Sequence, residues 1–338
     1  MTIAEAIGAA GVQVGPGGPA SAAQVVPGGA ASAAQAFPGE AAQAFLSAPA
    51  MRLGGRFRLD ERISKADGFP VWKATDELLC RPVTVYLLPR GLPVPPYVVA
   101  AVRAAARISD PRLATIYDTD YSPGAPYIVS EWNRGTHLED LVLSGLPSPA
   151  LAAAMIADAA DAVAVAHRAG RPHLCLGPRS LLWHTGSGLK ITGLGIDAAL
   201  CAASAADPAA ADTVSLARLL YALLTGCWPG DDPSALPTAP RHKGRVYSPR
   251  QVRAGVPGVL DAITGYALGL QPHASPRSPL TPAGLATALR SVQRPWYASF
   301  RPAGCVPELE TMSRRHARHA KASRDGARHR TTLLRPAA

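Results

Sequence analysis

Cysteine and histidine are the first residues whose types and spacing can be tested for chemistry. The five cysteines are widely spaced, odd in number and never form a Cys-X-X-Cys pair: Cys80, Cys175, Cys201, Cys227 and Cys305. This pattern indicates neither a disulfide framework nor a zinc ribbon, and it favours a reducing, cytosolic setting. Cys305 precedes His316 and His319, but the spacing is irregular and a fourth ligand, His329, is distant. The sequence therefore predicts no metal site.

The net charge of +10 is concentrated at the C-terminal end. From Arg294 onward ten Lys/Arg face three Asp/Glu, so this stretch carries +7 and the rest of the chain is nearly neutral. Residues 314–330 are a candidate for binding an anionic membrane surface at the inner leaflet. The absence of interleaved aromatic residues disfavours nucleic acid as a partner. A solvated, disordered tail, native or produced by a frameshift, is the alternative.

The N-terminal 50 residues form a loose repeat in which each unit opens with Pro-Gly. Such units interrupt helices and offer few large apolar side chains, so we expect a disordered leader over 1–50. The first Lys or Arg is Arg52, which excludes the basic start of a signal peptide. No apolar run reaches 18 residues, because Asp158 and Asp161 interrupt the best one. We therefore expect a soluble, cytoplasmic protein.

The elements that position any site begin near Arg52. Five β-rich segments with turn residues between them predict an antiparallel meander, and they cover 55–63, 69–77, 81–89, 113–121 and 125–132. An Ala-rich helix is expected over 97–108. Apolar residues on a 3.6-residue period predict helices over 149–169 and 213–225. We predict a bilobal α+β protein with a five-stranded lobe over 53–135, a helical lobe over 136–293 and a basic tail over 294–338.

Seven consecutive landmarks over about 53–290 resemble the bacterial eukaryotic-like Ser/Thr protein kinases. They include VWKATDELLCRPVTVYLLP, PYIVSEWNRGTHLEDLV, AVAHRAGRPHLCLGPRSLLW, LKITGLGID and DTVSLARLLYALLTGCWP. The resemblance implies a protein-kinase-like fold, and it implies which positions should bind ATP-Mg²⁺ and transfer phosphate.

The residues at those positions differ from the family pattern. Tyr86 stands for the strand-three lysine, Cys175 for the catalytic aspartate, Gly177 for the phosphate-contacting lysine, Ser180 for the metal-binding asparagine and Gly193 for the metal-binding aspartate. Neither a neutral phenol nor a thiol replaces these charges. The sequence thus predicts no catalytic residue, no bound cofactor and no Mg²⁺-dependent ATP binding.

Other parts of the pattern are also altered. The glycine loop reads SKADGFP over 64–70, and no acid occurs between Glu77 and Asp110 to pair with a lysine. Lys73 is an alternative source of the missing cation. Only sixteen residues separate Gly195 from Asp212, which predicts a shortened activation segment.

The architectural positions are retained: His173, Gly195 and Asp212. We therefore expect a pseudokinase that is not an enzyme. Its cleft should be closed by packing, with Tyr86 reaching toward the Gly193 loop and its hydroxyl bonding to the backbone.

The DGF tripeptide (67–69), HLCL (173–176) and GLG (193–195) resemble the actinobacterial pseudokinases associated with the lipid II flippase. This resemblance implies a catalytically inactive scaffold or regulator of peptidoglycan synthesis. It also implies protein partners, among them a forkhead-associated (FHA) phosphothreonine reader and the cell-wall flippase machinery. The alternative is an atypical Ser/Thr kinase, or a nucleotide-binding remnant, with weak activity.

Overall fold

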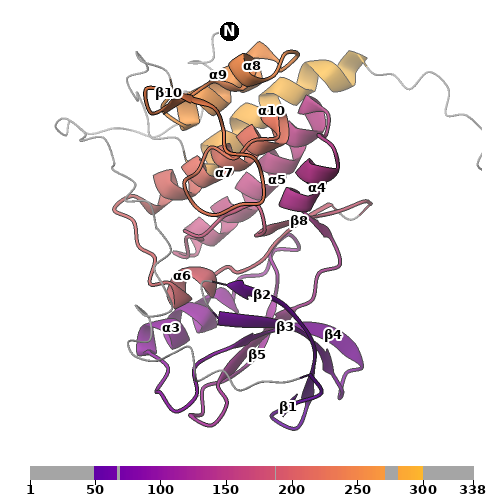
Figure 1. Ribbon diagram of the computed structural model, residues 1–338, viewed down its shortest axis with the longest axis vertical. Coiled ribbons are helices and arrows are strands. Elements are labelled where there is room, and N and C mark those ends of the chain that lie inside the picture. The colour runs from indigo at the N-terminus through magenta and orange to yellow at the C-terminus, as the bar shows by residue number, and fades with distance from the viewer. Residues whose placement is uncertain (1–48, 67–68, 187, 271–280, 300–338) are drawn as a thin grey trace, which may run out of the picture. The chain divides into compact units, whose positions relative to one another are not determined.

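The computed structural model describes residues 49–66, 69–186, 188–270 and 281–299. The predicted leader and tail lie outside these residues, except for 49–50 and the helix that reaches Ser299. The described residues up to Gln293 form one compact unit, to which the following description applies (Figure 1).

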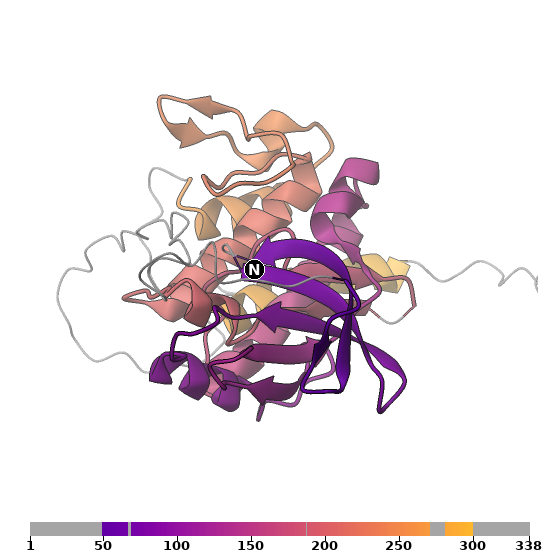
Figure 2. The same cartoon turned by 60° about the horizontal axis from the view of Figure 1, so that its bottom comes forward.

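The N-terminal lobe is built on an antiparallel sheet in the order β1-β2-β3-β4-β6-β5. Its strands are β1 Arg52–Leu53, β2 Phe57–Ala66, β3 Phe69–Asp76, β4 Arg81–Leu87, β5 Ile116–Asp120 and β6 Tyr127–Glu131. The sheet therefore has six strands where five were expected. The extra strand is a two-residue segment that pairs with the start of β2. Figure 2 shows the sheet curling around the lobe.

Alternation along the strands gives this sheet two apolar faces. One face, with Trp72, Val83 and Val85, packs within the sheet's own curl. The other face carries Val71 and Tyr86 and packs on α3, Pro96–Ala105. Every expected strand is present within a few residues of its predicted bounds, because each is short, β-branched and flanked by turns.

The C-terminal lobe is helical. Its helices are α4 Leu138–Ser144, α5 Pro149–Arg168, α6 Asp197–Leu200, α7 Pro208–Thr225, α8 Pro249–Val252, α9 Gly258–Ala267 and α10 Pro282–Ser299. The core lies where α5 and α7 pack together, and the alanines of α5 are buried there. Helix α5 is long and apolar enough to cross a membrane, but most of it is buried in this core.

Two helix bounds differ from the prediction. Helix α7 begins at Pro208 and not near Asp212, because Asp207 caps it by accepting a hydrogen bond from the Ala210 N–H at 3.0 Å. Helix α10 continues past the predicted domain boundary at 293 and ends at Ser299.

A small three-stranded sheet was not predicted. It consists of β7 Thr136–His137, β8 Leu181–His184 and β9 Gly188–Ile191, all antiparallel. A further hairpin joins β10 Arg241–His242 to β11 Arg245–Val246. Strands β8 and β9 matter for the site, because the loop before β8 and the loop after β9 carry most of the predicted positions.

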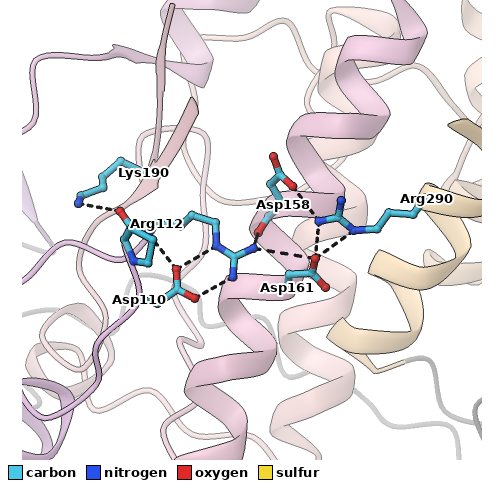
Figure 3. A network of polar contacts seen from close by, with 7 residues as sticks. Asp110, Arg112, Asp158, Asp161, Lys190 and Arg290 are labelled. Carbon is cyan, nitrogen blue, oxygen red and sulfur yellow. Dashed lines mark hydrogen bonds and ion pairs between the residues drawn. The ribbon is translucent and has the colours of Figure 1, made fainter. Parts of the chain in front are cut away.

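Asp158 and Asp161, the two acids within the apolar helix α5, belong to a network of polar contacts (Figure 3). Arg290 of α10 donates to Asp158 at 2.8 Å and to Asp161 at 3.0 Å. Arg112 donates to both carboxylate oxygens of Asp110 and, at 3.3 Å, to the carbonyl of Asp158. The network ties the loop after α3 to α5 and α10.

Candidate active site

The loop before β8 is held by one buried carboxylate. Asp212, on α7, is fully buried and accepts hydrogen bonds from the backbone N–H groups of His173 and Leu174, each at 2.7 Å. The Nε2 atom of His167, on α5, lies 2.7 Å from the same carboxylate. Buried charges need such partners, so Asp212 fixes this loop to both central helices. The architectural role of Asp212 stays a prediction, and these hydrogen bonds are its geometric basis.

His173 connects that loop to the one after β9. Its ring is fully buried, and Nε2 donates to the carbonyl of Thr192 at 2.9 Å. Burial lowers the pKa of His173, against the opposing effect of Asp212. The imidazole is therefore neutral, with its hydrogen on Nε2. Gly195, with φ +72°, lies against the α3 backbone, where a Cβ atom would come 3.1 Å from the Ala101 carbonyl oxygen.

Three of the altered positions share the loop before β8. The hydroxyl of Ser180 donates to the Cys175 carbonyl and accepts from the Gly177 N–H, both at 3.1 Å. Ser180 is thus engaged in holding the loop. A Cβ atom at Gly177 would meet nothing within 4 Å, so open space replaces the lysine expected by resemblance. Cys175 places its sulfur 3.4 Å from that of Cys201.

Tyr86 lies between the sheet, α3 and α6. It is 6% exposed and belongs to an apolar cluster that includes Phe69 of β3, Val102 of α3 and Leu200 of α6. Burial raises the pKa of Tyr86 well above its usual value, and the nearby charge of Asp197 adds to the effect. The packing expected of Tyr86 is present, and its charged neighbour is the side chain of Asp197. A phenol therefore joins elements that kinases join by a Lys–Glu ion pair.

Asp197 is the functional candidate that sequence reasoning missed. A Cβ atom added to Gly193 would overlap the Asp197 carboxylate and would lie 2.5 Å from its Cγ atom. The carboxylate thus occupies the space in which an aspartate at 193 would begin. Asp197 is therefore a candidate for the role that the resemblance assigns to an aspartate at 193. The signal was an acid four residues after the glycine, at the first turn of a short helix.

Lys73 is a cation on the same side of the sheet as Tyr86. Lys73 and Trp72 are neighbours in β3, so their side chains point to opposite faces of the sheet. Trp72 belongs to the apolar cluster with Val83 and Val85, whereas Lys73 lies opposite Thr84 of β4. Its ammonium lies 5.4 Å from the ring centre of Trp132, in the segment after β6. β2 and β3 pair as far as Ala66 and Phe69, while residues 67–68 of the predicted glycine-loop equivalent lie outside the described residues.

A hollow of about 410 Å³ lies beside this site. Its walls come from α3 (Ala101), from the segment around His173 (Arg171, Leu174) and from α6 (Ala199). Among the described residues, no group of three or more His, Cys, Asp or Glu side chains is placed to hold a metal ion.

Comparison with known proteins identifies what this arrangement resembles. No family model matches the chain. In a search of solved structures, the kinase domain of Mycobacterium tuberculosis PknI (C20A mutant) matches with a TM-score of 0.57 and 16% identity, covering 73% of this chain and 99% of that domain. This chain has a protein-kinase-like fold.

Sequence relatives agree with that fold. Serine/threonine-protein kinase PknL of M. tuberculosis is 27% identical over 248 residues, which cover 65% of this chain and 62% of PknL. PknB of Mycolicibacterium smegmatis is 29% identical over 65% of this chain and 40% of its own length. A probable Ser/Thr kinase of Streptomyces coelicolor is 32% identical over 44% of this chain and 24% of its own. The chain thus spans less than two thirds of each of these relatives.

These relatives correct one prediction. The chain was predicted not to be an enzyme, whereas its homologues are named Ser/Thr protein kinases and point to an enzyme. That prediction rested on the residue types at single positions. A side chain from another position can occupy the same space, as Asp197 does at Gly193.

Proposed function

We propose that this chain is an atypical Ser/Thr kinase-type domain that binds a Mg²⁺–nucleotide and transfers phosphate slowly. The observation that carries the proposal is the Asp197 carboxylate over Gly193. The proposal is supported by the catalytic-loop framework, in which Asp212 and His173 hold the backbone as a phosphate-transferring loop requires.

The residues present fit one magnesium ion carried by a nucleotide. Mg²⁺ prefers oxygen ligands and is commonly held by one or two carboxylates together with substrate phosphates. Asp197 is a partly exposed residue whose Oδ1 atom is buried, and we expect its carboxylate to serve as such a ligand. Ser180 is engaged within its own loop, and the Cys175 thiol is a poor ligand for a hard cation. The bound ion would neutralise charge on the transferred phosphate.

Lys73 is the side chain that we expect to contact the nucleotide phosphates in place of a lysine at Tyr86. Val71 is the residue of β3 that pairs with Tyr86. Lys73 comes two positions after Val71 on the same face of the sheet, so the two residues are about 6.6 Å apart along the strand. Moving the Lys73 ammonium away from the Trp132 ring loses a cation–π contact worth about 0.5–1 kcal/mol. A hydrogen bond from the ammonium to a phosphate offsets this loss.

The proposed reaction is slow for a stated reason. Cys175 stands where a kinase uses an aspartate to accept the hydroxyl proton, and positioned general bases contribute about 10²–10⁴-fold to rate. We therefore expect turnover lower than that of an ordinary kinase domain by about this factor.

Labelled ATP with Mg²⁺ and a generic Ser/Thr-rich acceptor protein tests the proposal. The full chain should incorporate phosphate, and both Asp197→Asn and Lys73→Met should lose that incorporation. Asp207→Asn is the matched control, because asparagine also caps helix α7 and the residue lies outside the site. Incorporation that is absent in the parent, or equal in all four proteins, would refute the proposal.

A second candidate function is regulation of cell-envelope synthesis through protein partners. The observation that favours it is the apolar contact of Tyr86, which holds the sheet, α3 and α6 together without needing a nucleotide. Its proposed partners are an FHA phosphothreonine reader and the flippase machinery. Its proposed place is the cytoplasm near the inner leaflet, with residues 314–330, outside the described residues, on anionic lipid.

This candidate function has its own test. A purified FHA domain should bind the chain after a Ser/Thr kinase has phosphorylated it and should not bind the unphosphorylated chain. Equal binding to both forms would exclude phosphothreonine recognition. Sedimentation with phosphatidylserine vesicles, compared with a chain truncated after Ser299 at the end of α10, tests the membrane contact.

A further inference from the structure

Two cysteines far apart in sequence meet beside the candidate site. Cys175 lies in the loop before β8, and Cys201 is the C-cap residue that follows Leu200, the last residue of α6. Their sulfur atoms are 3.4 Å apart although 26 positions separate them in the chain. Of the other cysteines, Cys80 is exposed and Cys227 is partly buried, and Cys305 lies outside the described residues.

Hydrogen bonding orients the two sulfurs. The Cys201 thiol donates to the carbonyl of Asp197 at 2.7 Å. Because a thiol has a single hydrogen, the hydrogen between the two sulfurs then belongs to Cys175. The Cys201 sulfur consequently turns a lone pair toward Cys175.

We propose that Cys175 and Cys201 are a redox-active dithiol that forms an intrachain disulfide when the protein meets hydrogen peroxide. A disulfide has an S–S distance of about 2.05 Å, so the two sulfurs must approach by about 1.4 Å. Each cysteine is flanked by non-regular backbone, Leu174 with φ 61° and Ala202 with φ 51°. Neither cysteine lies inside a long helix or strand that would have to move as a whole.

The chemistry assigns different roles to the two residues. The sulfur of Cys175, a partly exposed residue, attacks one peroxide oxygen, forming a sulfenic acid and releasing water. The sulfur of Cys201, which is 5% exposed, then attacks the sulfenic sulfur and releases a second water. Two thiols lose two electrons and two protons in total, and one peroxide is reduced to two waters.

The disulfide would join both walls of the hollow beside the site. Leu174, next to Cys175, lines one wall, and Ala199 and Ala202 of the α6 segment line the other. Helix α6 also begins with Asp197 and packs on Tyr86 through Leu200. Oxidation would therefore fasten α6 to the loop held by Asp212.

The test uses the full reduced chain under native conditions. After peroxide and quenching, the denatured protein should show three free thiols where the reduced protein shows five. Tryptic digestion should give a cross-linked pair of peptides, 169–179 and 191–218, whose mass is two hydrogens below their sum.

Matched variants distinguish this pair from general oxidation. Cys175→Ser and Cys201→Ser should each abolish the cross-linked peptide pair, whereas Cys80→Ser should retain it. The thermal midpoint should rise on oxidation of the parent and of Cys80→Ser only. Five thiols surviving in the parent, or cross-links made chiefly through Cys80 or Cys227, would overturn the proposal.

Discussion

The carboxylate of Asp197 occupies the space next to Gly193 in which the side chain of residue 193 would otherwise begin. Gly193 has φ +85°, a left-handed conformation that glycine adopts without strain. In the proposed site, Gly193 and Asp197 together take the role that the resemblance assigns to a single aspartate. This pair underlies the proposed nucleotide site.

Tyr86 is expected to be a major contributor to stability. Truncation by Tyr86→Ala removes a buried ring from the cluster shared by the sheet, α3 and α6, so we expect a loss of about 3–5 kcal/mol in the free energy of unfolding. Tyr97→Ala, at a position 47% exposed, should cost less than about 1 kcal/mol. Urea unfolding measures both. Equal, small losses would mean that Tyr86 does not pack as described.

Substitution of Gly195 tests how closely the backbone of the loop after β9 approaches α3. A Cβ atom at Gly195 would overlap the Cβ of Ala105 and approach the Ala101 carbonyl, so Gly195→Ala should push α3 away. Gly91 has nearly the same φ, +74° against +72°, but open space around it. Both substitutions carry the backbone strain of about 1 kcal/mol, and only Gly195→Ala adds the clash. Thermal unfolding should show a clearly larger loss at 195, and equal losses would contradict the contact.

His173 makes stability depend on pH. Burial lowers its pKa in the folded state, so the unfolded chain binds the proton more readily below the ordinary value of 6.5. The stabilisation is complete above pH 6.5 and is lost as pH falls, by up to about 1.4 kcal/mol per pH unit while His173 stays neutral.

The pH effect is isolated by a substitution. Burial also lowers the pKa of His137, which therefore contributes with the same sign. Urea unfolding at pH 7.5 and 5.5 should give a smaller difference for His173→Gln than for the parent, since His137 is present in both. An unchanged difference would show that His173 is not held neutral.

Much of the fold was predictable because its signals are local. Alternating β-branched residues define the strands, and the alanine-rich period of α5 defines a core helix. Asp207 and Pro208 form a helix-start signal, and α7 begins there. The predicted start was wrong because the resemblance placed the beginning of this helix near Asp212. The short strands β1 and β7 have no periodicity to detect, since pairing with distant segments creates them.

The site was predicted less well than the fold. Asp212 and His173 could be singled out because the resemblance places both residues by their order in the chain. The contact between Asp197 and Gly193 was missed because no sequence motif links an acid to a glycine four residues earlier. The contact between Cys175 and Cys201 was missed for the same reason, since a 26-residue separation matches no disulfide or metal motif.

Mg²⁺-dependent ATP binding, measured by thermal shift and by titration calorimetry, tests the central claim most directly. The parent should be stabilised by ATP only when Mg²⁺ is present, by about 2.7 kcal/mol at 100 times the Kd. Asp197→Asn should lose the Mg²⁺-dependent part, and Asp207→Asn should keep it. No stabilisation of the parent at millimolar ATP-Mg²⁺, or an equal stabilisation of Asp197→Asn, would contradict the assignment of Asp197 to the metal position.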